Sequence, residues 1–390
     1  MSGLLAATML ARHGWTVDVF ERVAGELAGR GAGIVAQRDL IARLDGLGID
    51  TRDLGVSIAT RKVLDAEGRV IATTQCPQIL TAWERVYRVL RDALPPERYH
   101  RGRSLEAFDQ NAHGVIASFS DGSTAAGDML IGADGLRSTV RQQCLPALAP
   151  CYAGYVAWRA LVAESALPPA IHRDLFAAMT FCLPPGEQFL GYPVAGADND
   201  LRPLHRRYNI VWYRPADEAA ELPRLLTDES GVTHPISIPP PLIPHAAIAA
   251  MREAAERLLA PQFRAVVRLI EEPILQPIYD LASPRLAFGR VAIIGDAAFV
   301  ARPHVAAGVS KAADDAAALA AALEETDVAT GLRHFEAQRL PEGKKIIERA
   351  RHLGAYLQAT QSAEERTRSV RHGIPQAVLA ETAVLDFLRR

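Results

Sequence analysis

Hydrophobic and polar positions at the N-terminus predict a helix followed by a strand. Residues 2–13 carry apolar side chains at helical spacing, and the pattern ends at Gly14. Residues 15–20 then alternate as a β-strand does and lead to Glu21. This order is typical of the second half of a βαβ dinucleotide-binding unit, in which Gly3 takes the place of the third fingerprint glycine. Because the first strand and the first two fingerprint glycines are absent from the sequence, we expect the true start to lie upstream; the alternative is a truncated copy with impaired pyrophosphate binding.

Two later stretches each combine a buried strand, an acidic turn and the start of a helix. Residues 291–294 are apolar and lead to Gly-Asp at 295–296, a small-residue loop and helix formers from 312 to 323. Residues 129–141 repeat this order, with Gly-Ala-Asp-Gly at the turn. Free backbone N–H groups and the helix dipole favour a polar or anionic group at such a turn. With the N-terminal helix and strand, the two stretches predict one nucleotide-binding domain assembled from separate segments.

Between the N-terminal strand and residue 150, the pattern predicts two further helices and two hairpins. The helices cover residues 39–47 and 82–94, and the hairpins turn at residues 67–68 and 121–122. Residues 25–37 are rich in glycine and predict a loop that either covers the cofactor or is simply flexible.

Segments rich in aromatic residues in the middle of the chain predict a second domain. Four strand patterns follow one another without helices of the usual connecting length, so we expect an antiparallel sheet; they lie at 152–162, 177–183, 189–194 and 207–213. A proline-rich loop, two helices and a returning strand follow, at 232–244, 246–259, 262–271 and 274–281. A long helix at 336–358 and another at 376–388 close the chain. The predicted division is a nucleotide-binding domain at 1–150 and 285–345, an inserted domain at 151–284, and C-terminal helices at 346–390.

Composition and charge argue against several classes of function. The net charge of −2 over 390 residues gives no general affinity for nucleic acid or acidic membranes. No apolar run is long enough for a membrane span, and the N-terminus lacks the basic region of a secretory signal. The four cysteines show no CxxC spacing, so we expect free thiols, no metal site and a reducing, cytoplasmic location.

The acidic turns decide between the cofactors that such a unit can hold. A nicotinamide-dependent dehydrogenase would use the N-terminal unit without needing Gly-Ala-Asp-Gly and Gly-Asp-Ala-Ala, whereas an extended cofactor such as FAD explains both. These turns, at 132–138 and 295–298, together with Arg-Pro-His-Val-Ala-Ala-Gly at 302–308, resemble the single-component FAD-dependent aromatic hydroxylases of the p-hydroxybenzoate hydroxylase fold. Tyr-Ala-Gly-Tyr-Val-Ala-Trp-Arg at 152–159 is similar to the 2,6-dihydroxypyridine 3-monooxygenase branch. The resemblance implies an α/β fold, with a Rossmann-like FAD-binding domain and an inserted antiparallel-sheet substrate domain.

The resemblance also implies which residues hold FAD. Glu21 would bind the adenosine ribose, and Arg88 would reach the phosphate or ribityl region. Asp134 lies in a turn shared between FAD and NAD(P)H contacts, and Asp296 would accept a hydrogen bond from a ribityl hydroxyl. Pro303 would lie against the flavin ring, with backbone N–H groups of the following residues near its pyrimidine carbonyl. The full expected set is Gly3, Glu21, Arg22, Arg88, Asp134, Gly135, Asp296, Pro303, Ala307, Gly308, Val309 and Ser310.

The implied activity is hydroxylation of an electron-rich aromatic or N-heteroaromatic ring, such as a dihydroxypyridine. NAD(P)H would reduce FAD, O₂ would give a flavin hydroperoxide, and the ring would attack its distal oxygen. His304 is the candidate base for a substrate hydroxyl, although a packing histidine is an equal interpretation. Tyr192 and Tyr213 are candidates to line the substrate face, with core packing as the commoner fate of such residues. The alternatives are a flavin oxidoreductase that does not oxygenate and a flavin-free remnant that only binds; a homodimer is left open.

Overall fold

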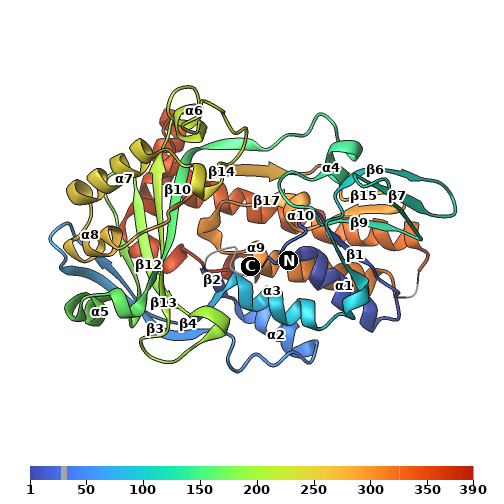
Figure 1. Cartoon of the computed structure of the whole chain (residues 1–390), viewed down its shortest axis with the longest axis horizontal. Helices are drawn as coiled ribbons and strands as arrows, with labels where there is room; N and C mark the ends of the chain where they lie inside the picture. The colour runs from blue at the N-terminus through green and yellow to red at the C-terminus, as the bar shows by residue number, and fades with distance from the viewer. Residues whose placement is uncertain (28–32, 325, 390) are drawn as a thin grey trace.

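The computed structural model describes residues 1–27, 33–324 and 326–389 and divides into two halves (Figure 1). Among these residues, the large-sheet half forms a nine-stranded sheet, and the small-sheet half forms three short sheets. Helix α10 (Val328–Gly354) connects them, because it packs on α9 in the small-sheet half and on β14 in the large sheet. Of the glycine-rich loop predicted at 25–37, residues 28–32 lie outside the described residues.

The small-sheet half brings the two predicted strand–turn–helix stretches together. Strand β16 (Val291–Ile293) pairs in parallel with β9 (Leu130–Gly132). Since parallel strands end at the same edge of a sheet, the acidic turns that follow them are neighbours. Strand β1 (Val19–Glu21) pairs in parallel with β5 (Tyr99–Arg101), and among the described residues it forms no ladder with β9 or β16.

Two helices rich in small residues pack together beside these strands. Helix α1 (Ser2–Arg12) contacts α9 (Gly308–Ala322), and both bury several alanines. Small side chains allow these two helices to approach closely, and α9 also packs against α10. The predicted helix at 2–13 is confirmed, and the one predicted from residue 312 begins four residues earlier.

The remaining elements of the small-sheet half cover its edges. A three-stranded antiparallel meander packs against α4, and α2 and α3 lie beside α9 and α1. Their bounds are α2 (Arg38–Gly46), α3 (Trp83–Asp92), β6 (Leu105–Gln110), β7 (Val115–Phe119), β8 (Thr124–Gly127), α4 (Thr139–Cys144) and β15 (Ala287–Phe288). The hairpin predicted at residues 121–122 is confirmed as the turn between β7 and β8.

The large sheet has the order β17-β14-β10-β13-β12-β11-β3-β4-β2. All its pairs are antiparallel except β11 with β3, so the antiparallel sheet expected for the middle of the chain is extended by strands from residues 33–82. The strands are β2 (Gly33–Ala36), β3 (Val56–Leu64), β4 (Val70–Ala82), β10 (Cys151–Ala163), β11 (Ala178–Cys182), β12 (Gln188–Val194), β13 (Arg207–Pro215), β14 (Ile274–Ala282) and β17 (Phe299–Val300). The domain boundaries therefore stay a prediction, with residues 33–82 contributing to both halves.

Each face of the large sheet has its own core. One face packs on helices α5 to α8, which lie together on one side of the sheet in Figure 1. Their bounds are α5 (Pro169–Leu175), α6 (Glu221–Leu226), α7 (His245–Leu258) and α8 (Pro261–Arg268). The other face carries a tyrosine-rich core that includes residues of the C-terminal segment. None of the helices in the described ranges combines the length and apolar character needed to cross a membrane.

A buried arginine fixes the C-terminal segment against that second face. Arg61 is fully buried on β3, and its guanidinium donates to the carbonyl oxygens of Leu379 and Thr382 at 3.0 and 2.6 Å. Ala383 has a φ of 55°, its N–H donates to the carbonyl of His304 at 2.7 Å, and its own carbonyl accepts from Gln37. The helix predicted at 376–388 therefore ends early. It corresponds to α12 (Pro375–Glu381), which follows α11 (Ala363–Ser369) and stops at a turn that tertiary contacts impose.

Candidate active site

The turn after β16 presents Asp296 on a fixed backbone. Gly295 has a φ of +59°, and its N–H donates to Asp315 Oδ2 at 3.0 Å. Asp315 Oδ1 accepts from Arg339 Nε at 2.8 Å, and both side chains are only 4% exposed. The Asp296 carboxylate, in contrast, is 56% exposed. The buried ion pair therefore fixes the backbone of the turn, while the exposed carboxylate of Asp296 can accept hydrogen bonds from a ligand.

The N-terminus of α9 opens beside this turn. Pro303 begins a short 3₁₀ segment, and Ala307 precedes the helix without a side-chain cap. Gly308, Val309 and Ser310 form the first turn of α9, so their N–H groups have no acceptor within the helix. Gly308 is exposed, and a Cβ built on it would meet no atom within 4 Å. The segment expected to contact the flavin ring therefore has backbone donors at the positive end of a helix dipole, exposed at Gly308 and buried by Ser310.

The second acidic turn is fixed to the first. Asp134 Oδ2 accepts from the N–H of Val140 at 3.2 Å, so this exposed carboxylate caps the start of α4. Gly135 has a φ of +76°, which favours glycine. Arg141 is buried and donates to the carbonyl of Ala297 at 3.0 Å, in the first turn, and to Leu136 at 2.6 Å, in the second.

The start of α1 lies between two of the predicted cofactor residues. A Cβ on Gly3 would lie 3.4 Å from that of Ala133, in ordinary contact with the second acidic turn. Burial lowers the pKa of the Met1 amino group, while the charges of Glu21 and Asp296 act to raise it. Glu21, Asp296 and the turn that carries Asp134 therefore lie near the start of α1, where Gly3 is.

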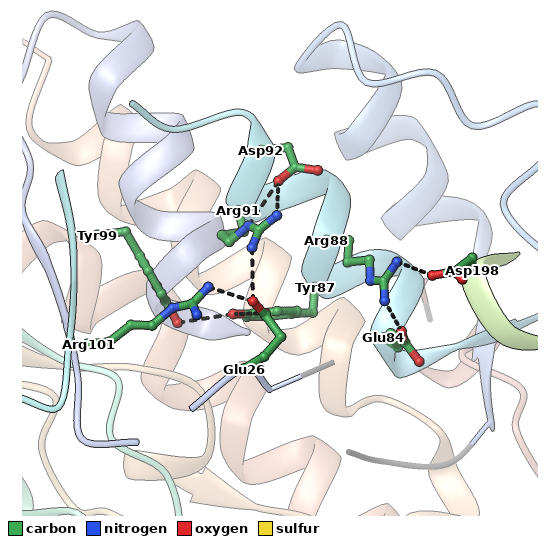
Figure 2. Close-up of polar contacts among 9 residues, drawn as sticks. All are labelled: Glu26, Glu84, Tyr87, Arg88, Arg91, Asp92, Tyr99, Arg101 and Asp198. Carbon is green, nitrogen blue, oxygen red and sulfur yellow. Dashed lines mark hydrogen bonds and ion pairs between the residues drawn. The ribbon is translucent and has the colours of Figure 1, made fainter. Parts of the chain in front are cut away.

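The segment after β1 is held by ion pairs. Glu21 Oε1 accepts from the N–H of Val23 at 2.9 Å, and Arg22 is exposed. The carboxylate of Glu26 contacts side chains of α3 and β5 (Figure 2), namely Tyr87 at 3.3 Å, Arg91 at 3.3 Å and Arg101 at 2.7 Å. Although partial burial acts to raise it, the hydrogen bond from Arg101 lowers the pKa of Glu26. These contacts fix the chain just before the glycine-rich loop.

Arg88 is already paired in this structure. It extends from α3 between Glu84 and Asp198, each 2.6 Å away, and its side chain is 37% exposed (Figure 2). Asp198 belongs to the large-sheet half, so Arg88 connects the two halves. Its expected contact with the FAD phosphate or ribityl chain stays a prediction, and such a contact would need to compete with two carboxylates.

His304 lies in a sealed aromatic environment. The residue is 2% exposed, Nε2 is 2.9 Å from the hydroxyl of Tyr155, and the ring of Tyr213 is centred 4.3 Å away. Burial, together with the charge of Arg302, lowers the pKa of His304 to about 3. Nδ1 is buried and meets no hydrogen-bond partner in the described part of the chain. The imidazole is therefore neutral near pH 7, and its role as a base stays a prediction.

Tyr192 and Tyr213 belong to the core of the sheet face against which His304 packs. Tyr192 is 4% exposed and donates to the carbonyl of Gly33 at 2.8 Å, while Asn209 accepts from the N–H of the same glycine at 3.0 Å. Burial raises the pKa of Tyr192 to about 12 and that of Tyr213 above its usual value. Tyr192 thus anchors the start of β2, and Tyr213 packs against His304.

Relatives of known activity match almost the whole chain. The 2,6-dihydroxypyridine 3-monooxygenase of Paenarthrobacter nicotinovorans is 32% identical over 379 residues, which cover 96% of this chain and 94% of that enzyme. The 3-amino-4-hydroxybenzoate 2-monooxygenase of Streptomyces cremeus is 30% identical over 369 residues, covering 90% and 84%. The chain belongs to the FAD-dependent aromatic monooxygenases of the p-hydroxybenzoate hydroxylase fold.

Solved structures and a family model agree with this membership. The structure of 2,6-dihydroxypyridine-3-hydroxylase from Arthrobacter nicotinovorans aligns with a TM-score of 0.86 at 32% identity, over 93% of this chain and 91% of that one. That of Klebsiella pneumoniae HpxO complexed with FAD and uric acid, at 23% identity and a TM-score of 0.73, shows the same fold. The family model described as FAD binding domain-like matches residues 152–280, the central strands and outer helices of the large-sheet half.

The residues at the two acidic turns fit the cofactor of this family of flavoprotein monooxygenases. The exposed carboxylate of Asp296 can accept from ribityl hydroxyls, and the open backbone at Gly308 leaves space for a ring. Within the described ranges, no group of three or more His, Cys, Asp or Glu side chains could hold a metal ion. Sequence reasoning missed Tyr155, the partner of His304, and Lys311, a buried lysine beside Asp296. The only sequence signal for Lys311 was a lone cation in an alanine-rich helix.

Proposed function

We propose that this monooxygenase uses NAD(P)H and O₂ to hydroxylate a hydroxylated N-heteroaromatic ring of the dihydroxypyridine class. Identity of 32% over 96% of the chain to a 2,6-dihydroxypyridine 3-monooxygenase is the observation that carries the proposal. When bound, FAD would supply the redox chemistry that transfers one oxygen atom from O₂ to the ring. The chain itself would bind the cofactor, orient the substrate ring, exclude water and accept the proton of a ring hydroxyl.

The two acidic turns would hold the cofactor. Asp296 would accept from the ribityl chain, and Pro303 would support the ring. The N–H groups of Gly308, Val309 and Ser310 would stabilise negative charge that develops on the ring system. The ion pair beneath Gly295 supports this proposal, because it fixes the backbone without engaging Asp296.

The tyrosine-rich face of the large sheet would receive the substrate. Loss of a proton from a ring hydroxyl raises the electron density of the ring, which makes it a better nucleophile. His304 is the proposed acceptor, because its lowered pKa keeps the imidazole unprotonated and its Nδ1 is unpaired among the described residues. An imidazole with a pKa of about 3 is a weak base, but a ring anion formed beside it would raise that pKa, because a negative charge stabilises the imidazolium. Tyr155 and Tyr213 would position the imidazole for this step.

The test is coupled turnover with purified, FAD-supplemented protein. Oxidation of NADH and of NADPH is followed with 2,6-dihydroxypyridine, and with pyridine as the matched ring without hydroxyls. We expect oxidation stimulated only by the dihydroxypyridine, with a product heavier by one oxygen atom. A yellow protein whose oxidation is not stimulated would indicate a non-oxygenating oxidoreductase, and a protein that gains no flavin would indicate a binding remnant. Stimulation that yields only hydrogen peroxide would reject this substrate.

A further inference from the structure

Lys311 is a buried cation without an adequate counter-charge. The residue is 1% exposed, and Nζ makes no hydrogen bond within the described ranges. Its nearest carboxylate oxygen is Asp296 Oδ1 at 3.7 Å, which is too long for a hydrogen bond, and that side chain is largely solvated. Burying an ammonium in this state is costly, so such groups normally meet a charged partner. Lys311 is also one of four lysines in a chain that otherwise uses arginine.

The surroundings of Lys311 favour an anion. It lies in the first turns of α9, and its ammonium approaches the Gly295–Asp296 turn. That turn also contacts the start of α1, because a Cβ on Gly295 would clash with the hydroxyl of Ser2. Both helices exceed two turns, so the positive ends of two helix dipoles and one ammonium surround the same turn.

We propose that Lys311 binds the phosphate of FAD that is attached to the ribityl chain. The phosphates are the only permanent negative charges of the cofactor, and this one is the nearer to a ribityl chain held by Asp296. The ammonium would make a charge-assisted hydrogen bond to this phosphate in a buried setting, and the phosphate would supply the counter-charge that Lys311 lacks. This assignment rests on the cofactor of the family and not on the proposed substrate.

Flavin affinity separates this role from a structural one. Kd values for FAD, FMN and riboflavin are measured by quenching of flavin fluorescence with the whole chain, without NAD(P)H or substrate. In Lys311→Met we expect the Kd for FAD and for FMN to rise roughly 10- to 100-fold, the loss typical of one charge-assisted hydrogen bond, while that for riboflavin is unchanged. Lys311→Arg should recover part of the affinity, and the exposed Lys344→Met should match wild type.

Three results would overturn the assignment. If riboflavin loses as much affinity as FAD, Lys311 acts through Asp296 or the ribityl chain and not on a phosphate. If no flavin loses affinity, the partner of Lys311 is another part of the protein and not the cofactor. Failure of wild-type protein to bind any of the three flavins would also reject it. Equal urea midpoints of wild type and Lys311→Met would exclude misfolding as the cause of a lost flavin affinity. Because the flavin affinities are measured without substrate, they do not depend on whether the proposed substrate is turned over.

Discussion

The buried pair beneath the Gly295 turn gives a stability prediction with a defined size. In Asp315→Asn the side chain keeps its shape and an oxygen that can accept from the N–H of Gly295, but it loses its charge. Arg339, which is 4% exposed, then keeps its ion pair with Glu342, whose side chain is 47% exposed, and the charge of the nearby Asp314. The variant therefore isolates the cost of a buried guanidinium deprived of its buried carboxylate.

The expected loss follows from that geometry. Breaking a buried ion pair by removing one partner costs about 3–5 kcal/mol, because the remaining charge is uncompensated. Since the half-exposed Glu342 still neutralises part of that charge, we expect the lower end, about 3 kcal/mol. An exposed pair is worth about 0–1 kcal/mol. The matched control is Glu256→Gln, which breaks the pair between Glu256 and Arg268, with side chains 43% and 65% exposed.

Urea denaturation followed by tryptophan fluorescence measures these differences. Asp315→Asn should lower the free energy of unfolding by about 3 kcal/mol, and Glu256→Gln by less than about 1 kcal/mol. The double variant Asp315→Asn, Arg339→Met should recover stability, because it removes the orphaned charge and fills its space with an apolar side chain. A single variant within about 1 kcal/mol of wild type, or a double variant less stable than the single, would refute the argument.

Three other positions give further tests. His304 has a pKa of about 3 when folded and about 6.5 when unfolded, so the unfolded state binds more protons between these values. The difference in free energy of unfolding between wild type and His304→Gln should therefore be largest above pH 6.5. It should fall by about 1.4 kcal/mol per pH unit as the pH decreases towards 3, as measured by urea denaturation in a pH series. A difference that does not change with pH would contradict a buried neutral imidazole. Arg61→Met should release the C-terminal segment and speed its cleavage by carboxypeptidase at least several-fold, because the carbonyls after α12 lose their donors; unchanged cleavage would mean that packing alone holds it. A Cβ on Gly343 would overlap the ring of Phe299, so Gly343→Ala should cost about 1–3 kcal/mol in urea, and a neutral result would show that α10 can shift.

Much of the fold was predictable because its signals are local. Alternating residues, turn pairs and the repeated strand–turn–helix order predicted α1, the hairpins and both acidic turns, and the structure has all of them. The parallel pair of β3 and β11 was not predictable, since their partners are set by the whole sheet. The early end of α12 likewise depends on Arg61, more than 300 residues away in the chain.

The candidate site likewise contains features that the sequence predicted and features that only the fold revealed. The turn at 295–296 was recognisable from its order of strand, turn and helix, and the expected roles of Asp296 and of the first residues of α9 came from the family resemblance. The surroundings of His304 were not recognisable, because its pKa is lowered first by burial and then by the charge of Arg302. That burial, and the contact with Tyr155, 149 residues away in the chain, are set by the fold. Lys311 went unnoticed because lysines are ordinarily solvated, and sequence pattern alone does not reveal a buried one.

The peptide at Ala383 has a use beyond stability. Its N–H donates to the carbonyl of His304, while its own carbonyl accepts from Gln37 beside β2, so one residue contacts both the proposed substrate face and the strand that follows the glycine-rich loop. The rate at which this single amide exchanges with deuterium therefore reports how often its hydrogen bond to the carbonyl of His304 opens, and so reports on the backbone at the proposed substrate face.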